Sequence, residues 1–338
     1  MNPIKAKLLA VAVAGALCLV GGGAFFGFQH MQAQAATVGT LAAVSESAKA
    51  RQLPSIDTMM PEIPEVVDPF YVLIIGNDSR DGTVEANTSA HSTGPSRSDT
   101  MMLTYIDPQA YRVTLVSIPR DTSATVNGQP GTKINEAYYH HGAQGAMDAA
   151  GELAGVSITY YLEMDFVRFD RFVDAMGGIT VHVPIDMSLR DIVRGGTVSL
   201  SAGTQQLNGA EALVLARTRK PYGADQDAIR QTQDRQIVEA FIFKVAKELG
   251  LVSQGVDTLL AHVGTNWPEE ELRALVEDFA EHADQIIIHS GTGPYDGRIF
   301  DEYGGSWLAY REEDTWREII RVVEQGGDPQ AVVPLPWS

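Results

Sequence analysis

The sequence holds a single cysteine, and this scarcity removes several classes of protein at once. Cys18 lies in the apolar N-terminal part of a chain of 338 residues. One thiol forms no intramolecular disulfide and supplies no multi-cysteine metal site. The chain must therefore fold without an internal covalent cross-link, and any metal it binds must be held by other side chains.

Positive charge is also scarce. Lys and Arg total 25 against 43 Asp and Glu, so the formal net charge is -18. Non-specific binding to nucleic acid needs a basic face, and this balance argues against it. It does not exclude a local arginine pocket for phosphate, because a few residues are enough to make one.

The sequence has only one long apolar stretch, Leu8–Phe28, and Lys5 and Lys7 precede it. A helix of that length rises ~1.5 Å per residue and spans a hydrocarbon core of roughly 30 Å. We interpret 8–28 as a single transmembrane anchor, with residues 1–7 in the cytoplasm, because flanking lysines favour the inner side. A cleaved signal peptide is the alternative, since Ala33-Gln34-Ala35 fits a small-residue cleavage site; the length of the apolar stretch favours the anchor.

The rest of the chain divides by composition. Residues 29–69 are rich in Gln, Ala, Ser and Thr and then in proline, which is typical of a stiff linker outside the membrane. Residues 70–325 are predicted to form one folded domain, on the extracytoplasmic face of the cell membrane. Residues 326–338, with Pro334 and Pro336, are expected to be an unstructured tail.

The pattern from Phe70 onward is that of an α/β protein. Strands are predicted at 70–76, 100–106, 112–118, 159–163, 179–183 and 286–289, with a hairpin or irregular excursion at 186–207. Helices are predicted at 143–154, 165–176, 209–216, 227–249 and 313–325, with two more within 251–282. The last part is expected to complete the same domain, because one short strand is too little for a separate core.

Three apolar runs between Phe70 and Asp121 each lie beside acids and arginines. Asp78 and Arg80 follow the first run, Arg97 and Asp99 precede the second, and Arg120 and Asp121 follow the third. In an open α/β sheet the ligand usually lies beyond the carboxyl ends of the strands. Carboxylates hold hard cations, and guanidinium groups hold phosphate oxygens. This stretch is therefore predicted to be one wall of an active site for a metal-bound phosphate ligand.

A second charged cluster lies further along the chain. Arg217 and Arg219 are at the end of a short predicted helix, and Asp227 and Arg230 are at the start of a long one. The N-terminus of a helix carries free N–H groups and a positive dipole end, which attract phosphate. The alternative interpretation is that these charges pair on a solvated surface. Together with Arg97 and Arg120, the set favours an anion site.

The order of these motifs resembles the LytR-CpsA-Psr family of cell-wall glycopolymer transferases. The matching segments are Ile75–Arg80, Ser98–Met101, Val116–Asp121, Lys133–Asn135, Asp174–Gly178, Leu207–Gly209 with Glu211–Leu213, Ala216–Lys220 and Asp227–Gln236. Their order and spacing agree over about residues 70–250, and the single membrane anchor agrees too. Several independent motifs in one order are far more specific than any short pattern alone.

The resemblance implies a fold and a reaction. The fold would be a three-layer α/β/α sandwich with a mixed central sheet, preceded by a single transmembrane helix and holding a polyprenyl lipid in a hydrophobic pocket. The reaction would move a phospho-glycan polymer from a polyprenyl pyrophosphate carrier to a hydroxyl of peptidoglycan and release polyprenyl phosphate. The implied partners are the lipid-linked glycan, the peptidoglycan acceptor and the cytoplasmic membrane, with no nucleic acid.

The resemblance also implies roles for residues. Asp78 and Asp99 would hold Mg²⁺. The arginines that grip the pyrophosphate would be Arg80, Arg97, Arg120, Arg217, Arg219 and Arg230. Asp121 and Asp227 would orient arginines or act as a base, so Arg120, Asp121 and Asp227 are the candidate catalytic residues. The sequence departs from the family at Gln233, where another arginine is usual, and Arg235 is a possible substitute.

Two other functions fit the same residues. Water in place of the acceptor would make the protein a polyprenyl-pyrophosphate hydrolase. A protein that binds a lipid-linked glycan without turnover would be a sensor or regulator. The predicted helix with Phe166, Phe169 and Phe172 on one face leaves a further choice, between an ordinary core and the lining of a lipid channel.

Overall fold

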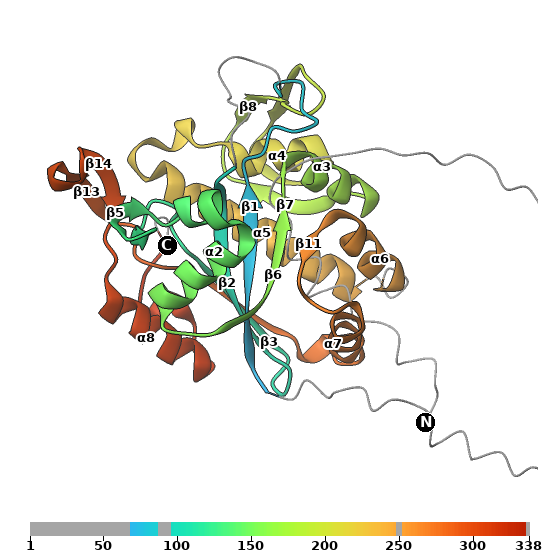
Figure 1. Ribbon diagram of the computed structural model, residues 1–338. Helices are drawn as coiled ribbons and strands as arrows, with labels where there is room; N and C mark the ends of the chain where they lie inside the picture. The colour runs from blue at the N-terminus through green and yellow to red at the C-terminus, as the bar shows by residue number, and fades with distance from the viewer. Residues whose placement is uncertain (1–67, 87–95, 248–251, 336–338) are drawn as a thin grey trace, which may run out of the picture. The chain divides into compact units, whose positions relative to one another are not determined.

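The three apolar runs form the centre of a six-stranded mixed sheet (Figure 1). The strands of this sheet are β1 (Phe70–Asn77), β2 (Ser98–Asp107), β3 (Arg112–Ser117), β6 (Ile158–Met164), β11 (Gly264–Thr265) and β12 (Ile287–Thr292), in the spatial order β11-β6-β1-β2-β3-β12. Strand β2 runs antiparallel to β1 and β3, whereas β6 and β12 pair in parallel with β1 and β3. The three predicted strands at the centre are confirmed.

The computed structural model describes residues 68–86, 96–247 and 252–335. These residues belong to one compact unit. The predicted cytoplasmic N-terminus, the transmembrane anchor and nearly all of the linker lie outside them. Within these three ranges, no helix is both long enough and apolar enough to cross a membrane.

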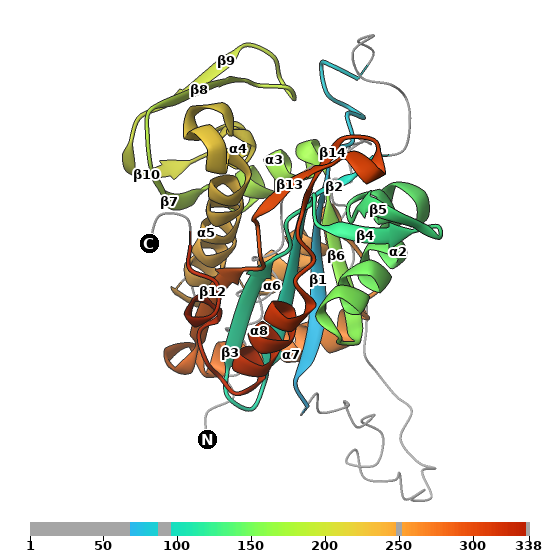
Figure 2. The same ribbon diagram turned by 90° about the vertical axis from the view of Figure 1, so that its left-hand side faces the viewer.

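Both faces of the sheet are buried, because successive side chains of its strands enter two different cores. On β1, Val72 and Ile74 join one core, and Leu73 and Ile75 join the other. Figure 2 shows α4 and α5 on one side of the strands and α2 on the other. The helices are α2 (Glu136–Ala154), α3 (Phe166–Ala175), α4 (Gly209–Arg217), α5 (Gln226–Lys247), α6 (Val252–His262), α7 (Glu269–Glu281) and α8 (Glu313–Glu324). Helices α3 to α7 cover the first core, and α2 and α8 cover the second, as expected of a three-layer α/β/α fold with a mixed sheet.

Helix α2 begins at Glu136, well before the start predicted at residue 143. Gly142 interrupts it with a φ of 62°, a left-handed conformation that glycine adopts without strain. The interruption breaks the helical periodicity of the sequence, and for this reason the first turns escaped prediction.

Four small two-stranded elements surround the central sheet. They pair β4 (Ser123–Val126) with β5 (Gln129–Lys133), β7 (Ile179–Val183) with β10 (Gly203–Leu207), β8 (Met187–Arg190) with β9 (Thr197–Leu200), and β13 (Gly297–Phe300) with β14 (Ser306–Ala309). The hairpin expected within 186–207 is confirmed. The β4–β5 and β13–β14 hairpins were not predicted, because these strands are only four or five residues long and bury few side chains, so their apolar pattern is too short to indicate a strand.

The last residues differ from the unstructured tail predicted for 326–338. Pro329–Ala331 form a 3-10 helix, and Gln330 Nε2 donates a hydrogen bond to the carbonyl oxygen of Ser290 in β12 at 2.7 Å. Val332 and Val333 pack against the second core. Proline ends regular structure without preventing packing, so the prediction was wrong for the described part of this segment.

Candidate active site

The site lies at one edge of the central sheet, where three strand ends meet. The C-terminal ends of β1 and β3 are at this edge, and so is the N-terminal end of β2 because β2 runs antiparallel to both. Gly76 pairs with Thr100 and Asn77 with Ser98, which places Asp78 and Asp99 at the same end of neighbouring strands. The three predicted motifs therefore begin or end at the same edge of the sheet.

Asp99 is the meeting point of three arginines from different parts of the chain. Its Oδ1 lies 2.6 Å from Arg120 Nη1, and its Oδ2 lies 3.4 Å from Arg219 Nη2. Its backbone oxygen accepts a hydrogen bond from Arg230 Nη2 at 2.9 Å. We call Arg120, Arg219 and Arg230, with Asp99 and Asp227, the arginine cluster. Their three guanidinium groups face these two carboxylates, and a further carboxylate, that of Asp234, also pairs with Arg230.

Asp227 lies in the first turn of α5 and faces the same three arginines. Its Oδ1 is 3.2 Å from Arg230 Nε and 3.7 Å from both Arg120 Nε and Arg219 Nη1. Burial alone would raise the pKa of this carboxyl, but the three cations hold the pKa well below its usual range. Burial and the charges of Arg230 and Arg120 lower the pKa of Arg219. Arg120 and Arg219 share these carboxylates and remain partly exposed, so their N–H groups are available to an anionic ligand.

Arg230 is the buried arginine of the cluster, and its side chain is 4% exposed. Its Nη1 lies 2.6 Å from Asp234 Oδ2 and donates to Thr100 Oγ1 at 3.0 Å, and Thr100 donates to the same Asp234 oxygen. Burial raises the pKa of Asp234 to about 6, although Arg230 opposes the shift. Sequence reasoning missed Thr100 and Asp234 as parts of the site. The signal was present, since Asp234 is four residues after Arg230 and residues at that spacing share a helix face.

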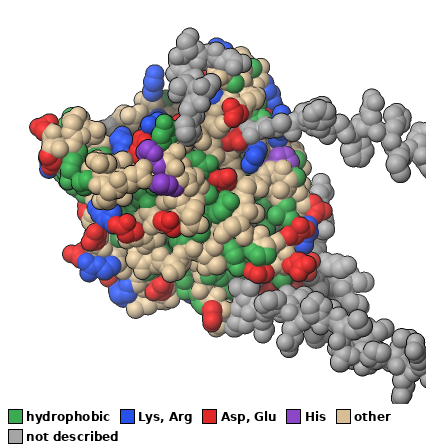
Figure 3. Space-filling view, in the orientation of Figure 1, with side chains coloured by type: hydrophobic (Ala, Val, Ile, Leu, Met, Phe, Trp, Pro, Cys, Tyr) green, Lys and Arg blue, Asp and Glu red, His purple; other side chains and the backbone are tan. Residues whose placement is uncertain are grey.

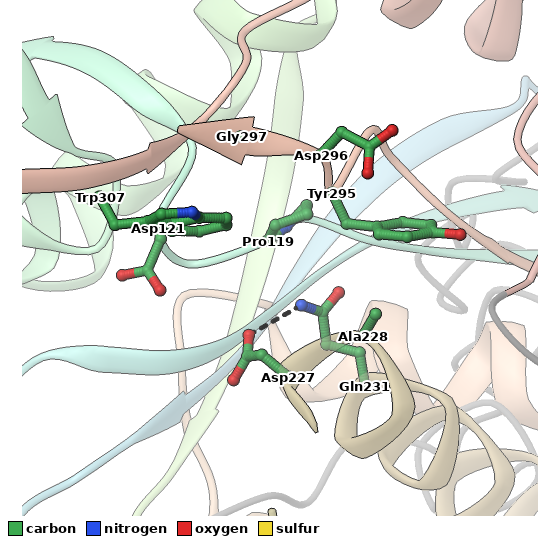
Figure 4. Close-up of a pocket in the computed structure, with 9 residues that line it drawn as sticks. All are labelled: Pro119, Asp121, Asp227, Ala228, Gln231, Tyr295, Asp296, Gly297 and Trp307. Atoms are coloured by element: carbon green, nitrogen blue, oxygen red, sulfur yellow. Dashed lines mark hydrogen bonds between the residues drawn. The ribbon is translucent and has the colours of Figure 1, made fainter. Parts of the chain in front are cut away.

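Asp121 is a further acidic neighbour of Arg120. Lys133 Nζ approaches its Oδ1 at 2.6 Å, and Arg120 Nε lies 3.8 Å from its Oδ2. Asp121 and Asp227 both line a pocket of about 180 Å³ (Figure 4). Gln231 belongs to the same wall and donates to Asp227 Oδ2 at 3.1 Å. Sequence reasoning missed Lys133 as a partner of Asp121, although Lys133 begins one of the matching segments.

Arg80 and Arg217 form a separate pair around the ring of Phe166. Their guanidinium carbons lie 5.0 and 5.1 Å from the ring centroid. Burial and the charge of Arg80 lower the pKa of Arg217 to about 10. Arg80 also pairs with Glu85 at 3.1 Å. The two arginines are held close despite their like charge, so this pair is a second candidate anion site next to the arginine cluster.

Arg97 lies outside both groups. Its Nε is 2.6 Å from Glu136 Oε1, and its guanidinium lies over the ring of Tyr139. Its backbone N–H donates to Asp78 Oδ1 at 2.8 Å. Arg97 therefore fixes the position of Asp78 and, in this conformation, does not point at the arginine cluster.

Asp78 and Asp99 are the candidate metal ligands. Burial raises the pKa of Asp78, and the neighbouring charge of Asp99 raises it further. A bound cation would relieve both effects. Mg²⁺ is usually held by one or two carboxylates together with waters and substrate phosphates, so two carboxylates at the same end of neighbouring strands fit it. In the described ranges no group of three or more Asp, Glu, His or Cys side chains is placed to hold a metal by itself.

The aromatic stripe of α3 belongs mainly to the core. Phe169 and Phe172 are fully buried in the first core, where Phe172 lies 5.1 Å from Phe241. Phe166 is at the end of the stripe between Arg80 and Arg217, so it joins the core to the second candidate anion site.

Comparison with known proteins identifies the family. The LytR_cpsA_psr family model matches residues 29–313. The chain belongs to the LytR-CpsA-Psr family. This confirms the resemblance read from the motifs.

Relatives of this family member share much of its length. Bacillus subtilis (strain 168) polyisoprenyl-teichoic acid–peptidoglycan teichoic acid transferase TagU is 32% identical over 234 residues, which are 67% of this chain and 70% of TagU. An uncharacterised Staphylococcus aureus protein is 31% identical over 200 residues, 59% of this chain, and the match spans only 47% of that protein. The crystal structure of B. subtilis TagV superposes with a TM-score of 0.62 at 26% identity and covers 79% of this chain and 98% of TagV.

The position where this LytR-CpsA-Psr protein departs from the family pattern has its own partners. Gln233 is buried and donates to the hydroxyl of Tyr222. Arg235 is fully buried and donates to Ser117 Oγ at 2.6 Å and Thr232 Oγ1 at 2.9 Å. Arg235 is therefore bound to hydroxyl groups and does not replace the missing arginine in the cluster.

Proposed function

We propose that this protein is a membrane-anchored phosphotransferase of cell-wall assembly. It moves a phospho-glycan polymer from a polyprenyl pyrophosphate carrier to a hydroxyl of peptidoglycan, outside the cytoplasmic membrane. The family membership and the name of TagU support the reaction class. The observation that carries the proposal is the arginine cluster, in which three arginines and two aspartates converge from four segments at one sheet edge.

In this proposal the arginine cluster binds the pyrophosphate of the donor. Arg120 and Arg219 are only partly buried, so their N–H groups can turn from Asp99 towards phosphate oxygens. Arg230 is held by Asp227 and Asp234 and supplies a fixed positive charge beneath them. Arg80 and Arg217, beside Phe166, would contact the part of the donor next to the pyrophosphate. Such charges are positioned before the reaction and stabilise the charge that develops in it.

The proposed chemical step is a displacement at phosphorus. The acceptor oxygen attacks the phosphorus that carries the glycan and forms a new P–O bond. The bond to the bridging oxygen breaks, and polyprenyl phosphate leaves with the electron pair. The proton of the acceptor hydroxyl passes to an aspartate, for which Asp121 and Asp227 are the candidates at the pocket. Mg²⁺ on Asp78 and Asp99 would neutralise part of the pyrophosphate charge when bound.

The test measures release of polyprenyl phosphate by the full chain in detergent. The wild-type protein receives Mg²⁺, a short-chain polyprenyl pyrophosphate sugar and peptidoglycan fragments. Arg120→Ala removes a cation that contacts Asp99 at 2.6 Å, and Asp99→Ala removes a proposed metal ligand. By analogy with the loss of one transition-state hydrogen-bond donor, we expect each change to lower kcat by about 10²- to 10³-fold.

The control is Arg298→Ala. Arg298 is an exposed arginine whose partner is Glu302, and we expect its loss to leave turnover unchanged. Release that needs no acceptor would identify a hydrolase instead of a transferase. Tight binding of the lipid without release, across several donor sugars, would leave only the binding or regulatory function. Unchanged release by Arg120→Ala would refute the assignment of the arginine cluster.

A further inference from the structure

The pocket beside Asp121 has a second wall from the far end of the chain. Asp121, Asp227 and Gln231 line it together with the residues from Tyr295 to Gly297 and Trp307. Figure 4 shows Asp121 beside Trp307, with the rings of Trp307 and Tyr295 across from Asp227 and Gln231. Asp227 belongs both to this pocket and to the arginine cluster.

Backbone hydrogen bonds connect the β13–β14 side of the pocket to the loop after β3 that holds Asp121. The N–H of Ala309, at the end of β14, donates to the backbone oxygen of Asp121 at 2.9 Å. The N–H of Tyr310 donates to the backbone oxygen of Asp296 at 2.8 Å. Trp307 is two residues before Ala309 on the same strand. Its position relative to the Asp121 carboxylate is therefore set by the fold and not by a free loop.

The β13–β14 hairpin exposes an unusual share of apolar surface. Of the seven large hydrophobic side chains exposed in the described ranges, four belong to residues 299–310: Ile299, Tyr303, Trp307 and Tyr310. Trp307 is 42% exposed. Hydrophobic side chains are visible at the left-hand edge of Figure 3, where Figure 1 places β13 and β14. Exposed aromatic residues in such a cluster usually mark a binding surface.

We propose that this pocket is the subsite for the acceptor glycan, with one sugar ring stacked on Trp307 and its reacting hydroxyl directed to Asp121. This inference rests on the proposed function. A sugar ring has an apolar face that covers an aromatic ring and a rim of hydroxyl donors that carboxylates accept. The pocket offers both, because Trp307 and Tyr295 supply aromatic surface and Asp121, Asp227 and Asp296 supply acceptors.

The charges favour the acceptor over the donor in this pocket. The charged side chains that line it are three carboxylates, which disfavour a pyrophosphate in the pocket itself. The donor phosphates are drawn instead to the arginines that contact Asp227. An uncharged, hydroxyl-rich ring is the occupant that suits this wall. The two substrates would then meet across Asp227 and Asp121.

The experiment measures donor and glycan binding separately, with the full chain in detergent. The glycan probe is an uncrosslinked oligosaccharide of N-acetylglucosamine and N-acetylmuramic acid, titrated by calorimetry and by tryptophan fluorescence. Trp307→Ala should weaken oligosaccharide binding by roughly fivefold to tenfold, the usual range for loss of an aromatic contact. The affinity of the Trp307→Ala protein for the polyprenyl pyrophosphate sugar should stay at the wild-type value. In turnover, KM for the glycan should rise while kcat stays nearly constant.

Two variants serve as controls. Trp307→Phe keeps an aromatic face and should keep most of the glycan affinity. Arg298→Ala changes the neighbouring strand of the hairpin outside the pocket and should bind as the wild type does. Equal glycan affinity in Trp307→Ala and wild type would overturn the subsite, and so would a wild-type protein that does not bind the oligosaccharide. If wild type binds glycan through Trp307 but does not bind the lipid donor, the subsite stands and the proposed transfer reaction fails.

Discussion

Asp121 and Asp227 line the same pocket but have different neighbours. Asp227 faces three arginines within 3.7 Å, and these hold its pKa well below the usual range. A carboxylate stabilised in this way accepts a proton poorly. Among the ion pairs of the described residues, Asp121 has one close contact, with Lys133, and a longer one with Arg120. In the proposed reaction the proton acceptor is therefore Asp121, and Asp227 orders the arginines.

This assignment predicts different losses for Asp121→Asn and Asp227→Asn. Asp121→Asn should lower kcat by about 10²- to 10⁴-fold and keep donor affinity, because only the proton acceptor is removed. Asp227→Asn should lower the free energy of unfolding at neutral pH by a few kcal/mol, because the buried Arg230 and two partly buried arginines lose a shared partner. Urea unfolding and polyprenyl phosphate release measure the two effects.

The pH dependence of Asp227→Asn gives an independent check. A carboxyl whose pKa is lowered on folding stabilises the protein above its unfolded pKa of about 4 and loses this effect as the pH falls further. The difference in stability between wild type and Asp227→Asn should therefore be full at pH 7 and shrink below about pH 4. A difference that grows on acidification would show that Asp227 does not act through its charge.

At the scale of single elements, the start of α3 carries a buried acid. Burial raises the pKa of Asp165 to about 7, although Arg168 opposes the shift. A carboxyl whose pKa is raised on folding contributes stability below its unfolded pKa of about 4, and this contribution is lost as the pH rises through about 7. Asp165→Asn should therefore flatten the fall in unfolding free energy between pH 4 and 7. Urea unfolding at several pH values measures this, and an unchanged profile would contradict it.

The elements that were predicted and those that were missed differ in how their apolar residues are arranged. The strands β1, β2 and β3 are continuous apolar runs, because both faces of the sheet are covered, and such runs are visible in the sequence. The hairpins β4–β5 and β13–β14 are short and bury few side chains, so their pairing depends on contacts outside themselves. Tyr303 illustrates this, since its ring lies where a Cβ on Gly131 would be.

At the scale of the whole molecule, the C-terminal third completes the domain. Strand β12 extends the central sheet beside β3, and α8 covers the second core through Trp316 and Ile319. The residues after α8 also cover the second core, because Val332 and Val333 pack on it. The expectation that this third belongs to the same domain agrees with these contacts.

Deletion of residues 328–338 should lower the free energy of unfolding by about 2–4 kcal/mol. It removes two half-buried valines, each contributing on the order of 1 kcal/mol, and the hydrogen bond from Gln330 to Ser290. Gln330→Ala alone should cost about 1 kcal/mol. Thermal and urea unfolding measure both changes, and equal stability of the deletion and wild type would show that this packing is not needed.

Much of the candidate site was predicted from the sequence because its residues lie next to strongly patterned segments. Asp78, Arg120 and Asp121 directly follow apolar strands, and Asp227 and Arg230 lie in the first turns of a long helix. The individual partners of the arginines were not predictable. Arg230 meets Asp99 across 131 positions of the chain, and no local pattern reports such a contact.

The sequence alone determined the class of the fold and which chemical groups are available to the site. Long apolar runs must be buried, so they become the central strands, and the acids and arginines at their ends supply oxygen ligands and cations. Only the tertiary structure decided which of these side chains meet. The antiparallel pairing of β2 brings Asp99 beside Arg120, Glu136 takes Arg97 away from the cluster, and the distant β13–β14 hairpin adds Trp307 to the pocket. The reason is physical: strand register and packing are set by contacts between residues far apart in the chain, whereas sequence patterns report local burial.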